Sequence, residues 1–212
     1  MIRTQKTMML GGGLLAASQA MAGDLLLWQT NSLSYLYGKD FAVNPPIQQT
    51  VTFEHADRWK YGDNFLFIDS TYYNGEKDRN KGVHAYYGEF SPRLSFGKIL
   101  DRRFELGPIK DVLLAMTYEN GEDDTEAYLI GPGFDPQVPR FNSAPLHLYP
   151  RHTEGSRPGD GVWQITPGWS YTLPLGNSSL LIDGYIDWVV DNDQNSHGTY
   201  HANLHFNPQI KY

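Results

Sequence analysis

Apolar and polar residues alternate along residues 162–173. The odd positions carry mostly large apolar side chains and the even positions small polar ones, with Trp163, Ile165 and Trp169 set against Gln164, Thr166 and Ser170. Successive side chains of a β-strand point to opposite faces, so this alternation predicts a strand with one apolar face. It resumes over residues 180–188, after a segment rich in Pro, Gly, Asn and Ser at 174–179. The two runs therefore predict an antiparallel hairpin.

The same alternation predicts eight further strands, which brings the total to about ten. They lie at residues 26–37, 49–57, 64–73, 83–96, 110–119, 126–133, 145–152 and 201–212. Polar or turn-forming segments separate them, including charged loops at 74–82 and 191–198, and residues 133–144 are expected to be irregular. A chain with this pattern is expected to form an all-β, antiparallel sheet.

The apolar faces of these strands are expected to be free of charge and to carry aromatic residues near their ends. This is typical of a transmembrane β-barrel, in which lipid lies outside and water inside. The same period also fits a soluble sandwich or a lipocalin-like barrel whose polar face is in solvent. The strand at 64–73 places Phe65 and Phe67 on the same side as Asp69, which predicts aromatic rings on a polar face.

The N-terminus favours the membrane interpretation. Arg3 and Lys6 precede an apolar run at residues 8–17, and Ala20-Met21-Ala22 has the small residues that a signal peptidase accepts. Residues 1–22 are therefore predicted to be a signal peptide cut before Gly23, followed by one domain at 23–212. About ten apolar residues are too few for a membrane-spanning helix. A membrane location would thus require a barrel, in the outer membrane.

Charge and composition exclude several classes of function. The formal net charge is −7, and loss of Arg3 and Lys6 would make it −7 − 2 = −9, which argues against binding to a nucleic acid polymer. The chain has 0 Cys, which excludes a disulfide framework. Its 14 Tyr, 21 Gly and 13 Pro suit many strands and turns.

No motif in the sequence indicates catalysis or metal binding. There is no G-x-S-x-G motif, and a Ser-His-Asp set could only be assembled by the fold. On a strand, His197, His201 and His205 would share a face, but each would lie about 13 Å from the next, too far to share one ion. We expect no catalytic residues, no metal and no cofactor.

Several stretches resemble the nucleoside-specific channel-forming proteins of the outer membrane, the Tsx family, and its OmpK-type branch in particular. These stretches are Trp28-Gln29, Tyr37-Gly38-Lys39-Asp40-Phe41, Thr52-Phe53-Glu54-His55-Ala56-Asp57-Arg58-Trp59, Asn64-Phe65-Leu66-Phe67-Ile68-Asp69, Glu89-Phe90-Ser91-Pro92-Arg93-Leu94-Ser95, Leu106-Gly107-Pro108-Ile109-Lys110-Asp111 and Asp187-Trp188. The resemblance implies a monomeric barrel of twelve strands that passes nucleosides by diffusion. Because about ten strands precede Tyr212, we expect two more beyond it; closure with ten is the alternative.

The resemblance also implies a site lined by aromatic residues for the base and ionisable groups for the sugar. Such a site stacks the base on rings and must bind weakly for flow to continue. The residues expected to line it are Phe41, Glu54, Phe65, Phe67, Asp69, Tyr87, Glu89, Arg93, Arg151, Asp183 and Asp187. Of these, Phe41 rests only on the analogy with the family. The excess of acids predicts a lumen that disfavours anions.

Two alternatives remain open. One is the same barrel without nucleoside selectivity, either a general porin or a surface receptor for phage or colicin-like binders through the loops at 74–82 and 191–198. The other is a soluble periplasmic β-protein. The expected partners are nucleosides and outer-membrane lipid, with the chain as a monomer.

Overall fold

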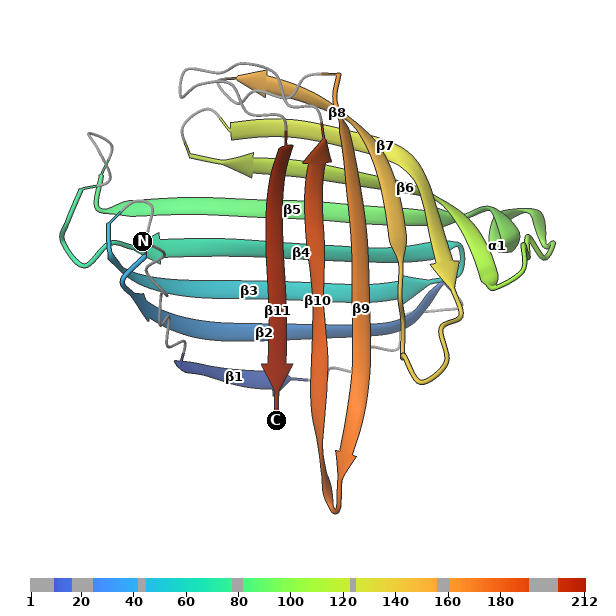
Figure 1. The fold of residues 1–212 in the computed structure, drawn as a ribbon, viewed down its shortest axis with the longest axis horizontal. Coiled ribbons are helices and arrows are strands. Elements are labelled where there is room, and N and C mark those ends of the chain that lie inside the picture. Colours follow the sequence, from blue (N-terminus) through green and yellow to red (C-terminus); the bar gives the residue numbers. More distant parts are fainter. Residues whose placement is uncertain are drawn as a thin grey trace. The chain divides into compact units, whose positions relative to one another are not determined.

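The fold consists almost entirely of antiparallel strands (Figure 1). The structure, a computed structural model, describes residues 10–16, 25–41, 45–77, 82–122, 125–155, 161–190 and 202–212. Its strands are β1 (Leu10–Ala16), β2 (Leu26–Lys39), β3 (Ile47–Trp59), β4 (Gly62–Tyr72), β5 (His84–Ser95), β6 (Ile109–Gly121), β7 (Thr125–Pro136), β8 (Leu146–Gly155), β9 (Trp163–Leu175), β10 (Ser178–Val190) and β11 (Ala202–Lys211). The one helix in the described residues is α1 (Phe96–Leu100).

The predicted all-β antiparallel fold class is confirmed. Each of the ten predicted strands is present, and its ends differ from the prediction by at most three residues. The strands follow one another through the sheet in chain order, from β1 to β11. This up-and-down order is the connectivity used by β-barrels. No helix in the described part of the chain has both the length and the apolar character needed to span a membrane.

The chain divides into two compact units, which are described separately. Unit 1 comprises Met1–Phe90 with Glu119–Thr125, and unit 2 comprises Ser91–Tyr118 with Glu126–Tyr212. Unit 1 is built on β2, β3 and β4, and unit 2 on β8 to β11 with most of β6 and β7. Each unit has two faces, because side chains alternate along its strands.

Strand β1 and helix α1 were not predicted. The backbone of β1, inside the predicted signal peptide, pairs with β2 and places Leu14 opposite Leu33. The predicted cleavage site lies outside the described residues, so cleavage stays a prediction. Helix α1 begins where a strand was expected to continue, because the buried Ser95 caps it: Ser95 Oγ accepts a hydrogen bond from Lys98 N at 3.0 Å.

In unit 1, the register separates the two faces cleanly. On the apolar face, Phe53 lies between Leu33 and Ile68, and all three are at least 40 % exposed. One residue along each strand, on the polar face, Glu54 lies between Ser32 and Phe67, and all three are half-buried. The face assignments made for these strands are confirmed.

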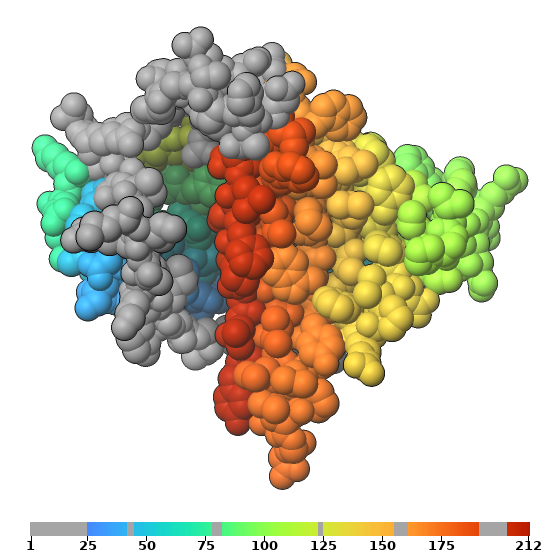
Figure 2. All heavy atoms as spheres, in the orientation of Figure 1, coloured from blue at the N-terminus to red at the C-terminus, as the bar shows by residue number. Residues whose placement is uncertain are grey.

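Unit 2 keeps the same separation at the hairpin of β9 and β10. Trp163 is 52 % exposed, whereas the next residue, Gln164, is 3 % exposed. Strands β9, β10 and β11 lie side by side and form one continuous surface in Figure 2. The alternation therefore places aromatic residues on one face and amides on the other, as predicted.

The apolar face of unit 2 is continuous even where β10 has no side chain. Gly184 has a φ of 152°, and a Cβ there would meet the Trp169 ring at 2.7 Å. The Trp169 indole therefore lies across Gly184 and contacts Phe206 on β11, with ring centroids 5.8 Å apart. An aromatic ring that covers a strand glycine in this way replaces its missing side chain.

The prediction that the apolar faces are free of charge is wrong on both units. In unit 1, His55 bonds Asn31 at 2.8 Å and Asp57 at 3.1 Å, on the face that carries Leu33. In unit 2, Glu126 is half-buried on the face that carries the exposed Ile130. Both carboxylates accept hydrogen bonds from neighbouring polar side chains, which lowers the cost of placing them there.

The polar face of unit 2 also carries apolar residues. Ala115, Ala127, Leu129 and Tyr149 form a buried apolar cluster there, each at most 2 % exposed. Among all the described residues, however, thirty large hydrophobic residues are exposed, whereas only six are buried. A water-soluble fold normally reverses that ratio, because burying apolar area is its main source of stability.

Candidate functional site

A row of three aromatic rings crosses the polar face of unit 1. Phe65 and Phe67, both on β4, have ring centroids 6.1 Å apart, and Phe67 and the β5 residue Tyr87 are 5.8 Å apart. The rings are tilted by 41° and 52°, and both centroid separations lie within the range that aromatic pairs favour. Phe65 is 38 % exposed, so the row is accessible from this face. The prediction that β4 places aromatic residues on a polar face is confirmed.

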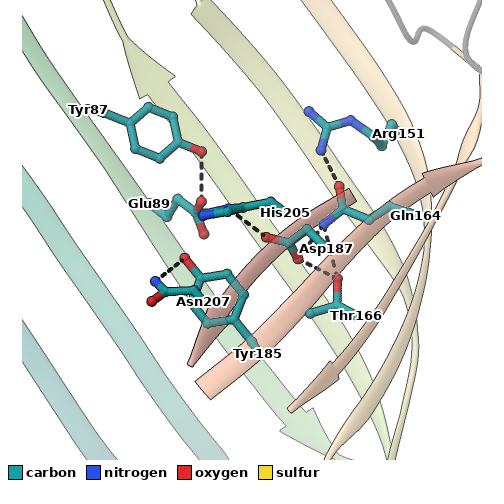
Figure 3. Close-up of polar contacts among 9 residues, drawn as sticks. All are labelled: Tyr87, Glu89, Arg151, Gln164, Thr166, Tyr185, Asp187, His205 and Asn207. Atoms are coloured by element: carbon teal, nitrogen blue, oxygen red, sulfur yellow. Dashed lines mark hydrogen bonds and ion pairs between the residues drawn. The ribbon is translucent and has the colours of Figure 1, made fainter. Parts of the chain in front are cut away.

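Carboxylates lie beside this ring row. The Tyr87 hydroxyl donates to Glu89 Oε1 at 2.7 Å, as Figure 3 shows. Ser32 Oγ donates to Glu54 Oε2 at 2.7 Å, and Thr52 Oγ1 donates to Asp69 Oδ1 at 2.5 Å. These bonds fix the directions in which the carboxylates point, and neutral hydroxyl donors leave the negative charges in place.

Phe41 also reaches the polar face of unit 1. It follows the end of β2, and its ring lies against the backbone of Gly38, where a Cβ would overlap it. Phe41 N donates to Pro46 O at 3.2 Å, which holds the start of the loop close to its end. Gly38 has the same strand parity as Ser32 and Ser34. The structure thus places the ring on the face where the family resemblance led us to expect it.

A connected set of polar residues occupies the polar face of unit 2. The Arg151 guanidinium donates to Gln164 Oε1, and the Gln164 amide donates to Asp187 Oδ1 at 2.9 Å (Figure 3). Thr166 donates to the same Asp187 oxygen at 2.8 Å, and His205 Nδ1 lies 4.0 Å from the other oxygen. Gln164 therefore joins two predicted site residues, Arg151 and Asp187, that are far apart in the sequence.

Arg93 belongs to a second group in unit 2. Its Nη1 donates to Asp135 Oδ1 at 2.8 Å and lies 3.3 Å from His147 Nε2. Since a guanidinium has only donors, His147 Nε2 is the acceptor in this contact. Asp135 was missed, because it falls in a segment expected to be irregular, whereas β7 continues to Pro136.

Asp183 forms the third polar contact on this face. Lys211 Nζ lies 2.9 Å from Asp183 Oδ2, and the other carboxylate oxygen is buried without a partner. Nearby on the same strands, Asn207 donates to the Tyr185 hydroxyl at 3.2 Å (Figure 3). All of these residues have the parity that the alternation gave them.

Within each unit, the predicted site residues share one face. Unit 1 brings together Glu54, Phe65, Phe67, Asp69, Tyr87 and Glu89, with Phe41 at the loop end, and unit 2 holds Arg93, Arg151, Asp183 and Asp187 on its polar face. The residues that hold them were missed: Gln164, Thr166 and Asp135 in unit 2, and Ser32 and Thr52 in unit 1. Their parity was a usable signal for all but Asp135, because it already placed them on the polar faces.

The chemistry of both faces is that of a binding surface. They offer rings, hydroxyls, amides and carboxylates, and among the described residues no group of three or more His, Cys, Asp or Glu is placed to hold a metal ion. His197 and His201 lie outside the described residues, so the spacing argument for the histidines remains a prediction. Comparisons with known proteins gave no match: no family model matches the chain, and no curated protein or solved structure is significantly similar to it.

Proposed function

We propose that this protein is a monomeric outer-membrane channel of the Tsx type, which lets nucleosides diffuse passively and catalyses no reaction. The observation that carries the proposal is the polar face of unit 1, where the ring row lies beside carboxylates that hydroxyl groups hold in place. A nucleoside is a flat base on a polar sugar. Rings can stack on the base, and the carboxylates can accept hydrogen bonds from the sugar hydroxyls.

The strength of such a site suits transport. Stacking on an aromatic side chain contributes about 1–3 kcal/mol per base when it is measured by alanine substitution. The three rings of unit 1 lie on the surface of a strand pair and do not enclose a ligand, so binding is expected to be weak. Weak binding lets each nucleoside leave again, which a diffusion channel requires.

The apolar faces support an outer-membrane location. Exposed residues on these faces include Leu33, Phe53, Trp163, Trp188 and Phe206. In a transmembrane barrel such residues contact hydrocarbon, and Trp and Tyr gather near the headgroups. The predicted signal peptide supplies the route to that membrane.

Planar bilayers containing the full-length protein test the proposal. Adenosine and thymidine should each reduce the ion current through the channel, with saturation as the ring row fills. Ribose alone should have a much smaller effect, because it has no base to stack. A current that neither nucleoside changes, up to its solubility limit, would remove the nucleoside selectivity.

A less selective porin, or a receptor used by phage or colicin-like binders, is the second candidate. The polar face of unit 2 favours it, since the contacts there are mainly ionic and amide contacts rather than a row of rings. Permeation of amino acids, sugars and nucleosides at equal rates would support this candidate over nucleoside selectivity. Recovery of the protein in the soluble periplasm would exclude both.

A further inference from the structure

Glu54 and Asp69 carry more negative charge than a neutral nucleoside needs. Each accepts a hydrogen bond from one hydroxyl group, and neither has a Lys, Arg or His partner among the described residues. In unit 2, by contrast, Asp135 and Asp183 each lie 2.9 Å or less from a cationic side chain. Glu54 and Asp69 therefore leave uncompensated negative charge on the polar face of unit 1.

The register brings these two charges close to the ring row. Thr52 pairs with Asp69, and Glu54 pairs with Phe67. Glu54 and Asp69 are thus diagonal neighbours on one face, with Cα atoms about 7 Å apart. Phe67, the central ring of the row, pairs with Glu54 and lies two residues from Asp69 on β4, on the same face. A ligand stacked on Phe67 would be within a few ångströms of both carboxylates.

This arrangement should bind a positively charged ligand more tightly than a neutral one. Two like charges at this separation repel each other, and a cation placed between them is attracted to both, which makes the summed interaction favourable. An aromatic ring face adds attraction for a cation through its quadrupole. The rings and carboxylates therefore favour a flat ligand that is also positively charged.

We propose that the polar face of unit 1 binds flat organic cations in preference to neutral ligands of the same shape. The proposal rests on the proposed function only in requiring that this face borders water. It names a second substrate class for the same rings: aromatic compounds with a fixed positive charge. It extends to nucleosides whose base carries such a charge.

The test compares 1-methylnicotinamide, a flat cation, with nicotinamide, its neutral counterpart. Calorimetric titration of the full-length protein in detergent micelles should give about tenfold tighter binding of the cation at neutral pH. The Glu54→Gln/Asp69→Asn double variant should bind the two compounds equally. The Glu76→Gln/Glu122→Gln variant removes the same charge from the loops and should keep the difference. Equal binding of both compounds by the unchanged protein overturns the proposal.

Ionic strength provides a measurement that does not depend on a variant folding. Raising salt from about 0.01 M to about 1 M shortens the Debye length from roughly 30 Å to roughly 3 Å, so the preference should shrink towards unity. A preference that salt leaves unchanged contradicts the charge argument.

The micelle titration separates this proposal from nucleoside transport. If adenosine fails to change the current in bilayers while the cation preference persists in micelles, the nucleoside proposal fails and the cation site stands. If adenosine reduces the current but the two nicotinamides bind equally, the cation site fails and the channel proposal stands.

Discussion

The polar faces of the two units use carboxylates in different ways. In unit 1, Glu54 and Asp69 each take a hydrogen bond from a hydroxyl on a neighbouring strand and keep their charge unbalanced. In unit 2, Asp135 and Asp183 face Arg93 and Lys211. Glu54 and Asp69 are thus left available to a ligand, whereas Asp135 and Asp183 are each matched by a cation.

This difference indicates that these carboxylates have different roles in the two units. A hydroxyl donor orients a carboxylate at a modest energetic gain and leaves its charge in place, whereas an ion pair or a buried amide fixes the side chain and cancels or shares the charge. Unit 1 is therefore suited to recognise a ligand, and unit 2 to hold the strands together.

Replacing Gln164 should cause the largest loss of stability. Gln164→Leu removes the acceptor of Arg151 and a donor to Asp187, at a residue that is 3 % exposed. Leaving a buried charged group without this partner should lower the free energy of unfolding by about 3 kcal/mol. Urea unfolding in micelles, followed by tryptophan fluorescence, measures it. Ser32→Ala in unit 1 is the matched control and should cost about 1 kcal/mol; equal losses would end the distinction between the units.

Removing the central ring of unit 1 should weaken nucleoside binding with little change in unit 2. Phe67→Ala takes away the ring that contacts both Phe65 and Tyr87. The loss should be about 2 kcal/mol, or about thirtyfold in the adenosine concentration that half-saturates the current block. Phe206→Ala on the apolar face of unit 2 removes a ring of the same size and should leave that concentration unchanged. An equal effect from both variants would argue against a ring site in unit 1.

Removing the carboxylate that Arg93 contacts should shift ion selectivity by a smaller amount. Asp135→Asn removes the carboxylate that Arg93 contacts at 2.8 Å and takes one negative charge from this face. One extra unit charge about 10 Å from a passing ion in water changes the ratio of cation to anion flow by roughly twofold. The reversal potential in a salt gradient measures this ratio, which should move towards anions. Glu54→Gln should move it in the same direction, and a shift towards cations in either variant would contradict the charge assignment.

The smallest effect is expected at Glu126 on the apolar face of unit 2. Tyr118→Phe removes one of its two hydroxyl donors, the bond at 3.0 Å, and leaves the Tyr128 bond at 2.6 Å. Because both tyrosines are exposed, water can replace the lost donor. The unfolding midpoint in micelles should not change measurably. A clear drop would mean that this carboxylate contributes to the strength of unit 2.

The strands were predictable because each has one face of each kind. Antiparallel strands with one apolar face alternate with period two, and the alternation for β9 and β10 is complete enough to assign most side chains. The prediction failed where local contacts ended or extended a strand. Ser95 caps α1 and so ends β5, and β7 runs on to Pro136 through a segment that lacks alternation.

The candidate residues were predictable, but their partners were not. Parity placed Asp69 with Phe67 and Arg151 opposite Leu148, and the structure agrees. That Gln164 joins Arg151 to Asp187 depends on how β8, β9 and β10 are aligned. The buried apolar cluster that contains Tyr149 was missed for a similar reason. Alternation does not distinguish apolar residues that face water from those that pack against each other.

The sequence by itself determined which residues share a face, since that follows from the two-residue period of a strand and needs no knowledge of its neighbours. The tertiary structure decided the rest: Thr52 beside Asp69, Asp135 beside Arg93, and Gln164 between an arginine and an aspartate. The physical reason is that hydrogen bonds and ion pairs act over about 3 Å. Their partners are therefore fixed by strand register, which is set by contacts between residues distant in the chain.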